Sequence, residues 1–151
     1  MKKIFFILVF SPFYVLSQND ITDFYFSDFP QSYTTDFYFS NSPQSYTTDF
    51  YFSDSPQSYT TDIYISKNNI GCDIEISSSP QSYTKDIYLS SSPQSYTKDI
   101  FISSSPQSYT KDIYISDNLS SSDLVICVPN NYVIDKRHIC VIVYLLKYSE
   151  E

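Results

Sequence analysis

Hydrophobic and polar residues alternate along most of this chain, in short stretches separated by prolines. In residues 95–103, one face of an extended chain would carry the mostly apolar residues Tyr96, Lys98, Ile100 and Ile102. The other face would carry hydroxyl and carboxylate side chains together with Phe101, where most sister stretches have Tyr. A period of two over nine residues predicts a β-strand with one apolar face.

These stretches are copies of one tandem repeat whose units begin at regularly spaced aspartates. The spacing is 13, 13, 13 and 11 residues, and the series occurs twice, starting at Asp23 and again at Asp73. The predicted repeat array, residues 18–122, therefore contains two 50-residue blocks, 23–72 and 73–122. Duplication of this kind is typical of repeat architectures, in which every unit forms the same structural element.

The length of the unit predicts how successive strands are connected. Thirteen residues divide into nine of strand and the four-residue segment Ser-Ser-Pro-Gln, in which proline suits a type I turn. The 11-residue units leave two residues for the turn, such as Asn68-Asn69. Because the two turn lengths differ by two, every strand keeps the same face inward. The expected fold is all-β, with the repeats forming an antiparallel meander in a sheet or sandwich.

A narrow β-solenoid is the alternative fold. Each 13-residue unit would then form one coil, with residues 100–102 and 108–110 as short strands on two stacked sheets. Stacked coils would place equivalent aspartates roughly 4.8 Å apart, where they repel. Gly71 is the only glycine, whereas narrow coils need residues that tolerate positive φ at their corners. These two points favour the meander over the solenoid.

Each unit has few apolar side chains with which to form a core. Burying two Ile or Phe side chains and part of a Tyr contributes roughly 4–8 kcal/mol, while ordering the unit costs on the order of 13–26 kcal/mol. We therefore expect a second apolar surface, from another sheet, another subunit or a membrane. Without one, edges such as residues 49–53 would favour self-association.

The N-terminal residues 1–17 are predicted to be a signal peptide. Lys2 and Lys3 precede a run of seven apolar residues, and residues 15–17 form an acceptable cleavage site before Gln18. This segment resembles the signal peptides of Gram-negative bacterial envelope and secreted proteins, so we expect a secreted or cell-envelope protein, extracellular or associated with the outer membrane.

The C-terminal residues 123–151 diverge from the repeat and are expected to form further strands or a cap. Residues 123–128 and 132–134 read as strands on either side of a turn at Pro129. Residues 139–146 are continuously apolar, which predicts a strand covered on both faces.

Few residues offer catalytic or metal-binding chemistry. The single glycine excludes the phosphate-binding loop and the dinucleotide fingerprint. His138 is the only histidine, so a histidine pair for a metal is excluded and a solvated turn is expected. The repeated aspartates lack the spacing of a calcium loop. We therefore predict no catalytic residue, no metal and no cofactor.

Three cysteines, an odd number, leave two interpretations of their chemistry. Cys127 and Cys140 occupy equivalent places in neighbouring units, which makes them the candidate disulfide and leaves Cys72 free. In the other interpretation all three are small buried hydrophobic residues.

The net charge of −8 argues against a nucleic-acid partner. Tyrosine, with 16 copies, is the most distinctive residue type, and its flat amphipathic ring suits contact with carbohydrate or another cell-surface protein. The candidate contact residues are the tyrosines at the centre of the strands: Tyr38, Tyr51, Tyr64, Tyr88 and Tyr114. The leading hypothesis is an exported, non-enzymatic repeat protein with a structural, adhesive or surface-binding role. The alternatives are a small outer-membrane β-barrel and a polysaccharide- or ice-binding solenoid.

Overall fold

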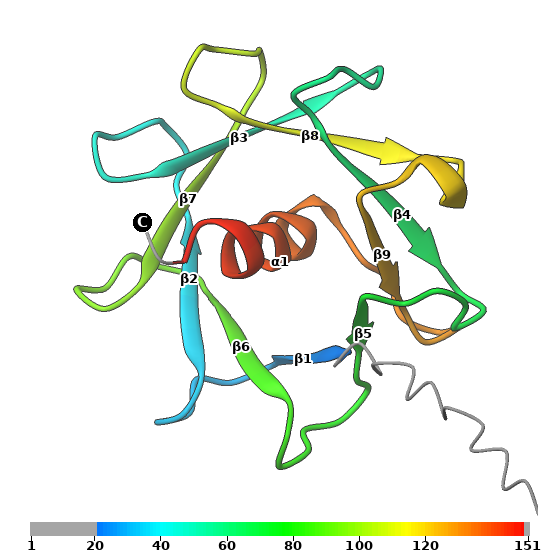
Figure 1. Cartoon of the computed structure of the whole chain (residues 1–151). Helices are drawn as coiled ribbons and strands as arrows, with labels where there is room; N and C mark the ends of the chain where they lie inside the picture. The colour runs from blue at the N-terminus through cyan, green and yellow to red at the C-terminus, as the bar shows by residue number, and fades with distance from the viewer. Residues whose placement is uncertain (1–20, 150–151) are drawn as a thin grey trace, which may run out of the picture.

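The computed structural model describes residues 21–149, so the predicted signal peptide lies outside the described residues. The described chain forms a ring of strands around one central helix (Figure 1). The elements are β1 (Thr22–Ser27), β2 (Thr35–Phe39), β3 (Thr48–Ser53), β4 (Thr61–Ser66), β5 (Ile74–Ile76), β6 (Lys85–Ser90), β7 (Lys98–Ser103), β8 (Lys111–Ser116), the 3₁₀-helix η1 (Leu119–Ser121), β9 (Leu124–Cys127) and α1 (Lys136–Lys147).

The nine strands of the described residues form a closed barrel in the order β1-β5-β9-β4-β8-β3-β7-β2-β6, and all neighbours are parallel. The all-β class of the repeat array is therefore confirmed, and the antiparallel meander is wrong. Parallel pairing is the arrangement that a solenoid would have. The closed barrel leaves no strand edge unpaired, which is how such folds avoid edge-to-edge aggregation.

The chain passes around the barrel twice. Strands β1 to β4 belong to the first block, β5 to β8 to the second, and β9 to the C-terminal segment. Around the ring, each strand of one block lies beside strands of the other block or beside β9. Of the strand pairs in the described residues, none joins two strands of one block. Every pair that does not include β9 joins the first block to the second, so the two blocks are interleaved.

A large stagger allows parallel strands to be joined by short loops, although such connections usually need about a dozen residues. Ile87 of β6 lies opposite Phe26 of β1 on one side and opposite Thr35 of β2 on the other. Phe26 and Thr35 thus lie at the same height along the barrel, although only nine residues of chain separate them. The chain never has to return along a full strand, so residues 28–34 are enough to reach β2. This is why a unit that reads like a hairpin forms a parallel barrel.

The predicted alternation holds within the strands. Within the two blocks, the residue after each repeat aspartate points into the barrel and is at most 1% exposed: Phe24, Phe37, Phe50, Ile63, Ile74, Ile87, Ile100 and Ile113. Ile63 and Ile74 flank an 11-residue unit, so the predicted conservation of inward parity is confirmed. In that short connection Asn69 and Gly71 have positive φ values of 49° and 68°.

The strands are shorter than the nine residues expected, because the segment before each strand forms a turn. In the unit of residues 95–103, the strand begins at Lys98 and Tyr96 lies in the preceding turn, where its side chain is 66% exposed. The backbone N–H of Thr97 donates to the carbonyl of Gln94 and closes this turn, as it does in the sister loops. The prediction that Tyr96 lies on the apolar strand face is therefore wrong.

Residues 139–146 form part of α1 and not a strand, so that prediction is also wrong. The barrel is closed and offers no edge to a tenth strand, whereas its interior offers a continuous apolar surface. Ile139 to Val143 are at most 5% exposed inside the ring, and the ring of Tyr144 packs edge-on against Phe37, 5.5 Å between centroids. A helix that is apolar nearly all round is suited to this position.

The segment before the helix agrees in part with the sequence analysis. Strand β9 confirms the strand expected at 123–128, and the expected turn at Pro129 is present. Residues 132–134 form no strand, so that prediction is wrong.

Cys72 forms a disulfide with Cys127, with a Cα–Cα distance of 5.6 Å. The predicted Cys127–Cys140 pairing is wrong, because Cys140 lies on α1 and is buried in the core. The disulfide fastens the segment before β5 to the end of β9, where the described ladder joins only two residue pairs. Burial raises the pKa of the remaining thiol, Cys140, so the neutral form is favoured.

Candidate binding grooves at the barrel rim

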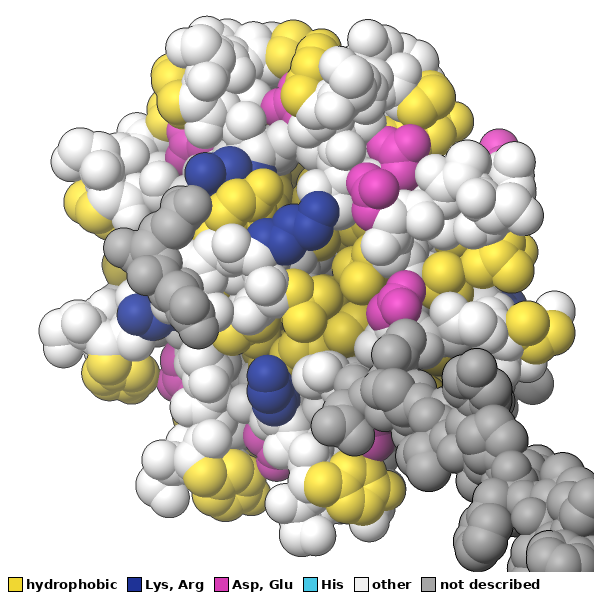
Figure 2. Space-filling model, in the orientation of Figure 1, with side chains coloured by type: hydrophobic (Ala, Val, Ile, Leu, Met, Phe, Trp, Pro, Cys, Tyr) yellow, Lys and Arg dark blue, Asp and Glu magenta, His cyan; other side chains and the backbone are white. Residues whose placement is uncertain are grey.

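Six tyrosines project from the loops that precede the strands. They occupy the same position of the repeat, in the sequence Ser-Tyr-Thr, and their exposure lies between 62% and 69%: Tyr33, Tyr46, Tyr59, Tyr83, Tyr96 and Tyr109. We call them the rim tyrosines. In the space-filling view the peripheral loops carry patches of apolar and aromatic surface around the barrel (Figure 2). Their exposure and regular repetition make the rim tyrosines candidate contact residues.

Four of the six rim tyrosines each form one wall of a groove, and the Pro-Gln-Ser segment of a neighbouring loop forms the other. The described grooves pair Tyr33 with residues 80–86, Tyr46 with residues 93–99, Tyr109 with residues 43–49 and Tyr59 with residues 106–112. We call these four the rim grooves. Neighbouring strands come from opposite blocks, so each rim groove combines a tyrosine of one block with a loop of the other.

Hydrogen bonds hold the polar side of each groove in place. In the groove that Tyr109 covers, the backbone N–H of Gln44 donates to Oγ1 of Thr47 at 3.1 Å. The hydroxyl of Thr47 lies 2.6 Å from Oδ1 of Asp49 and donates to that carboxylate. Asp49 is 7% exposed, so this bond satisfies a nearly buried charge. The same bonds recur in the sister loops, for example between Thr97 and Asp99 at 2.8 Å. The grooves are therefore preorganised by repeated loop chemistry.

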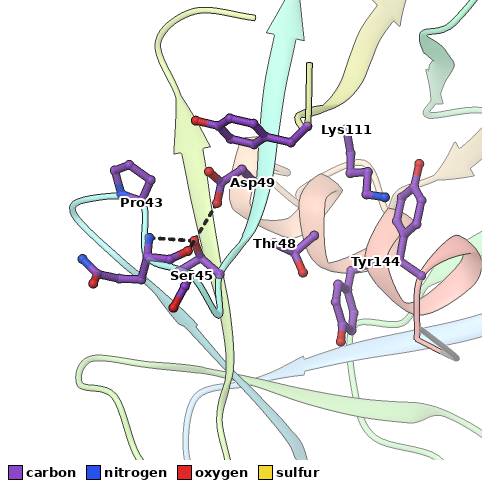
Figure 3. Close-up of a pocket in the computed structure, with 10 residues that line it drawn as sticks. Pro43, Ser45, Thr48, Asp49, Lys111 and Tyr144 are labelled. Carbon is purple, nitrogen blue, oxygen red and sulfur yellow. Dashed lines mark hydrogen bonds between the residues drawn. The ribbon is translucent and has the colours of Figure 1, made fainter. Parts of the chain in front are cut away.

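Two of the rim grooves extend inward to the C-terminal end of α1. The groove of residues 43–49 has a volume of about 640 Å³ and that of residues 93–99 about 680 Å³. Both are lined by Thr48 and Tyr144, so they meet at this point, and we call them the joined grooves. Figure 3 shows the first of them, with Pro43 and Ser45 on the loop side and Lys111 and Tyr144 on the helix side.

A lysine lies at the inner end of each joined groove, Lys111 in the first and Lys98 in the second. The ammonium group of Lys111 lies 4.3 Å from the centroid of the Tyr148 ring, a cation–π contact. The joined grooves therefore combine aromatic rings and hydroxyls with one lysine and one aspartate each.

The tyrosines predicted from the sequence lie elsewhere. Tyr38, Tyr51, Tyr64, Tyr88 and Tyr114 are on the outer wall of the barrel, each at the centre of a strand and half-buried, and we call them the wall tyrosines. None of them lines a rim groove. The sequence analysis missed the rim tyrosines because it continued the alternation through the loop. The signal that marks them is the Pro-Gln-Ser-Tyr-Thr motif that precedes every unit of this kind.

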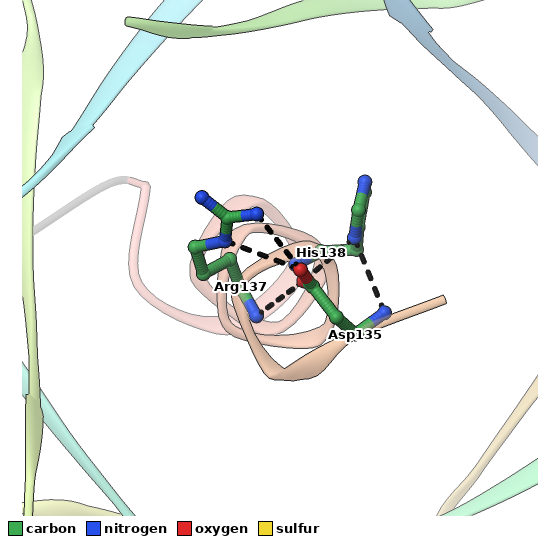
Figure 4. Close-up of polar contacts among 3 residues, drawn as sticks. All are labelled: Asp135, Arg137 and His138. Carbon is green, nitrogen blue, oxygen red and sulfur yellow. Dashed lines mark hydrogen bonds and ion pairs between the residues drawn. The ribbon is translucent and has the colours of Figure 1, made fainter. Parts of the chain in front are cut away.

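His138 belongs to a polar cluster at the N-terminal end of α1, and not to a solvated turn (Figure 4). Asp135 caps the helix by accepting from the backbone N–H groups of Arg137 and His138, at 2.9 and 3.2 Å. Its other oxygen accepts from the Arg137 guanidinium at 2.9 Å, while Nδ1 of His138 lies 2.7 Å from Oδ1 and accepts from the Asp135 N–H.

Two pKa values in this region depart from their ordinary values. Burial tends to raise the pKa of Asp135, but hydrogen bonds from Arg137 and His138 outweigh it, and the pKa is lowered. Burial, with the nearby charge of Asp135, raises the pKa of Tyr132 to about 12. The rings of Phe26 and Tyr132 pack edge-on against His138, with centroid distances of 4.5 and 5.8 Å. The cluster therefore serves to begin and anchor the helix.

Among residues 21–149, no group of His, Cys, Asp or Glu side chains is arranged to hold a metal ion. The α-helix of the described residues has 12 residues, and no helix in that range is long and apolar enough to cross a membrane. Comparison of the chain with protein-family models, curated proteins and solved structures finds no match.

Proposed function

We propose that this protein is a non-enzymatic binding protein that holds an extended polysaccharide in its rim grooves. The observation that carries the proposal is the repetition of one groove, with an exposed tyrosine facing a Pro-Gln-Ser loop, around the barrel. A tyrosine ring offers a flat face for a sugar ring, and the neighbouring amide and hydroxyl groups offer hydrogen bonds.

Repetition of the groove matches a ligand that is itself repetitive. Successive sugar units of one chain can occupy successive grooves, so the second contact forms within an existing complex. Weak individual contacts then add up to firm binding without a deep pocket. This is the behaviour expected of an adhesive or surface-binding protein.

Export of the protein is part of the proposal. A disulfide between Cys72 and Cys127 forms and persists in an oxidising compartment, which agrees with the predicted signal peptide. Mass spectrometry of the exported protein tests this prediction, because the mature chain is expected to begin at Gln18. Recovery of the chain with residues 1–17 still attached would contradict it.

Removal of two rim tyrosines tests the binding role. We expect Tyr46→Ala with Tyr109→Ala to weaken retardation in affinity gels containing soluble polysaccharides about tenfold. Each aromatic contact contributes roughly 0.5–1.5 kcal/mol, and 1.4 kcal/mol corresponds to tenfold in affinity. The matched control is Tyr51→Ala with Tyr114→Ala, which removes two wall tyrosines instead.

The control pair should leave retardation unchanged if the ligand lies on the rim. Loss of binding in the control pair, with binding retained in the rim pair, would assign the ligand to the barrel wall and contradict the proposal. Failure of every polysaccharide in the panel to retard the unaltered protein would also contradict it.

A further inference from the structure

Three of the four rim grooves share loops with one another. The loop of residues 106–112 forms one wall of the groove of Tyr59 and contributes Tyr109 to the next groove. The loop of residues 43–49 forms the other wall of that second groove and contributes Tyr46 to the third. We call this row of three grooves, those of Tyr59, Tyr109 and Tyr46, the track. Its loops precede β4, β8, β3 and β7, which are neighbours in the ring (Figure 1).

All three grooves of the track have the same orientation. In each of them the tyrosine belongs to the loop before one strand, and the Pro-Gln-Ser segment belongs to the loop before the next strand in the order β4, β8, β3, β7. This order is kept because the strands are parallel, so that the loops before them lie at the same end of the barrel. In an antiparallel sheet, consecutive loops would lie at opposite ends of the strands. The track therefore has a direction.

The chemistry of the walls also repeats along the track. In each groove the wall opposite the tyrosine includes Pro, Gln, Ser, Thr and Asp side chains. The glutamine carboxamide is held in place because its NH₂ group donates to the serine hydroxyl two residues earlier, as Gln44 does to Ser42 at 3.0 Å. Gln94 and Gln107 make the same bond, at 3.1 and 3.2 Å. Each groove thus presents one aromatic ring and one oriented carboxamide.

The repetition changes in the loop that follows the track around the ring. Beyond β7 the next strand is β2, and the loop before β2 has Phe29 where the other loops have this serine. The Phe29 side chain is 71% exposed, and it has no hydroxyl with which to hold Gln31. The fourth rim groove, that of Tyr33, begins at this loop and shares no loop with the track. The uninterrupted row therefore consists of the three grooves of the track.

We propose that the track holds one polysaccharide chain along the circumference of the barrel, by its interior units and in a single direction. The inference rests on the proposed carbohydrate-binding function and adds the direction and the length of the bound segment to it. The units of a polysaccharide follow one another in one sense, from the non-reducing to the reducing end. Only one direction therefore presents the same face and the same hydroxyl groups to every tyrosine ring and carboxamide of the track.

The first test measures affinity against chain length by isothermal titration. The probes are cello-, laminari- and xylo-oligosaccharides from dimer to hexamer, and the matching polymers in affinity gels are hydroxyethylcellulose, laminarin and xylan. In at least one series we expect the affinity to rise tenfold or more from dimer to hexamer, because the later contacts form within an existing complex. Equal affinity for dimer and hexamer, or retardation by a polymer whose hexamer does not bind, would overturn the inference.

The second test detects the direction of the bound chain. A hexamer of the binding series carries a nitroxide spin label at its reducing end, and the protein carries ¹³C-labelled tyrosine rings. Tyr59→Phe and Tyr46→Phe assign the NMR signals of the two tyrosines at the ends of the track. We expect the label to broaden one of these two signals and to leave the other sharp. Equal broadening of both would mean that the chain binds in either direction, which contradicts the inference.

Two single variants test whether the grooves act as one track. Tyr109→Ala removes the ring of the middle groove, and Tyr33→Ala removes a similarly exposed ring outside the track. We expect Tyr109→Ala to weaken binding of the hexamer about tenfold and to abolish the gain in affinity with chain length, because it separates the two outer grooves. Tyr33→Ala is the matched control and should change the affinity less than twofold. Circular dichroism of both variants checks that they fold.

The outcomes distinguish a failure of the track from a failure of the proposed function. Equal losses in the two variants would show that the grooves act independently, and this would overturn the track. The proposed function still stands if a polymer retards the unaltered protein and the loss of Tyr46 and Tyr109 weakens that retardation. Absence of retardation by all three polymers would overturn both.

Discussion

Six of the repeat aspartates are preceded, two residues earlier, by a threonine whose side chain bonds both the loop and the first part of the strand. Thr47 accepts the backbone N–H of Gln44 through its hydroxyl oxygen and donates to the carboxylate of Asp49. One side chain thus closes the turn and satisfies a nearly buried charge. The same pair recurs in six loops of the described chain, which explains why Thr occurs there in every full unit.

Thr47→Val should lower the free energy of unfolding by about 1–3 kcal/mol, because it leaves the Asp49 carboxylate and the Gln44 N–H without this partner. Urea unfolding followed by circular dichroism measures the change. Thr47→Ser keeps the hydroxyl and is the control, with an expected loss of less than half as much. Equal losses in the two variants would show that the methyl group matters as much as the hydroxyl, and would contradict the prediction.

Sequence reasoning at the residue scale succeeds where the physical rule is local. The alternation from Lys98 to Ser103 and the parity across Asn68-Asn69 follow from the period of two, and both are found. The rim position of Tyr96 could not be derived from that rule, because it depends on a turn closed by Thr97 and Gln94. An alternating pattern does not show where a strand begins or ends. The tyrosines at the centre of the strands were therefore predicted as the contact residues, and the rim tyrosines were missed.

At the scale of elements, the central helix completes the core. The barrel provides a lining of Phe and Ile, and α1 provides the second apolar surface that each unit lacks. Sequence reasoning predicted the need for such a surface but expected it from another sheet, another subunit or a membrane, and not from a helix. It also read residues 139–146 as a strand, because a continuous apolar run has no period that separates a buried strand from a buried helix. The helix signal was Asp135, which caps the helix three residues before His138.

The helix cap predicts a dependence of stability on pH. The folded-state pKa of Asp135 lies below its ordinary value, so the ionised carboxylate stabilises the fold at pH values above that ordinary value. This stabilisation is lost as the pH falls through the folded-state pKa. Asp135→Asn keeps the capping oxygen and removes the charge, so its stability should fall less than that of the unaltered protein between roughly pH 5 and pH 2.

Thermal unfolding at several pH values measures this difference. Asp135→Ala removes both cap and charge and should lose about 1 kcal/mol at neutral pH as well. Asp117→Asn, on an exposed residue outside the helix, is the matched control for the charge. Parallel acid profiles for the unaltered protein and Asp135→Asn would contradict the assignment.

At the scale of the whole molecule, the parallel order of the strands is the feature that sequence reasoning could not reach. A repeat unit specifies its own strand and loop, but not which unit becomes its neighbour. Ile87 pairs with residues of β1 and β2, some 60 and 50 positions away, through the stagger of the entire ring. Only closure of the ring fixes that stagger, since tilt, stagger and strand number are linked in a barrel.

The disulfide acts at this scale because it closes a loop of 55 residues and joins the narrow contact between β5 and β9. Cys72→Ser with Cys127→Ser should lower the free energy of unfolding by roughly 3–4 kcal/mol. Urea unfolding with and without a reductant gives the same comparison on the unaltered protein. Cys140→Ser is the control and should keep the response to reductant; a midpoint that reductant leaves unchanged would contradict the prediction.

The interleaving of the two blocks bears on how such a chain could arise. A chain of one block would have no partner for its own strands, since no strand pair of the described residues lies within a block. It could satisfy its backbone by threading through a second, identical molecule, as an obligate homodimer. Gene duplication would then join two interlocked subunits into one polypeptide, and the 50-residue period is the trace that such a fusion leaves.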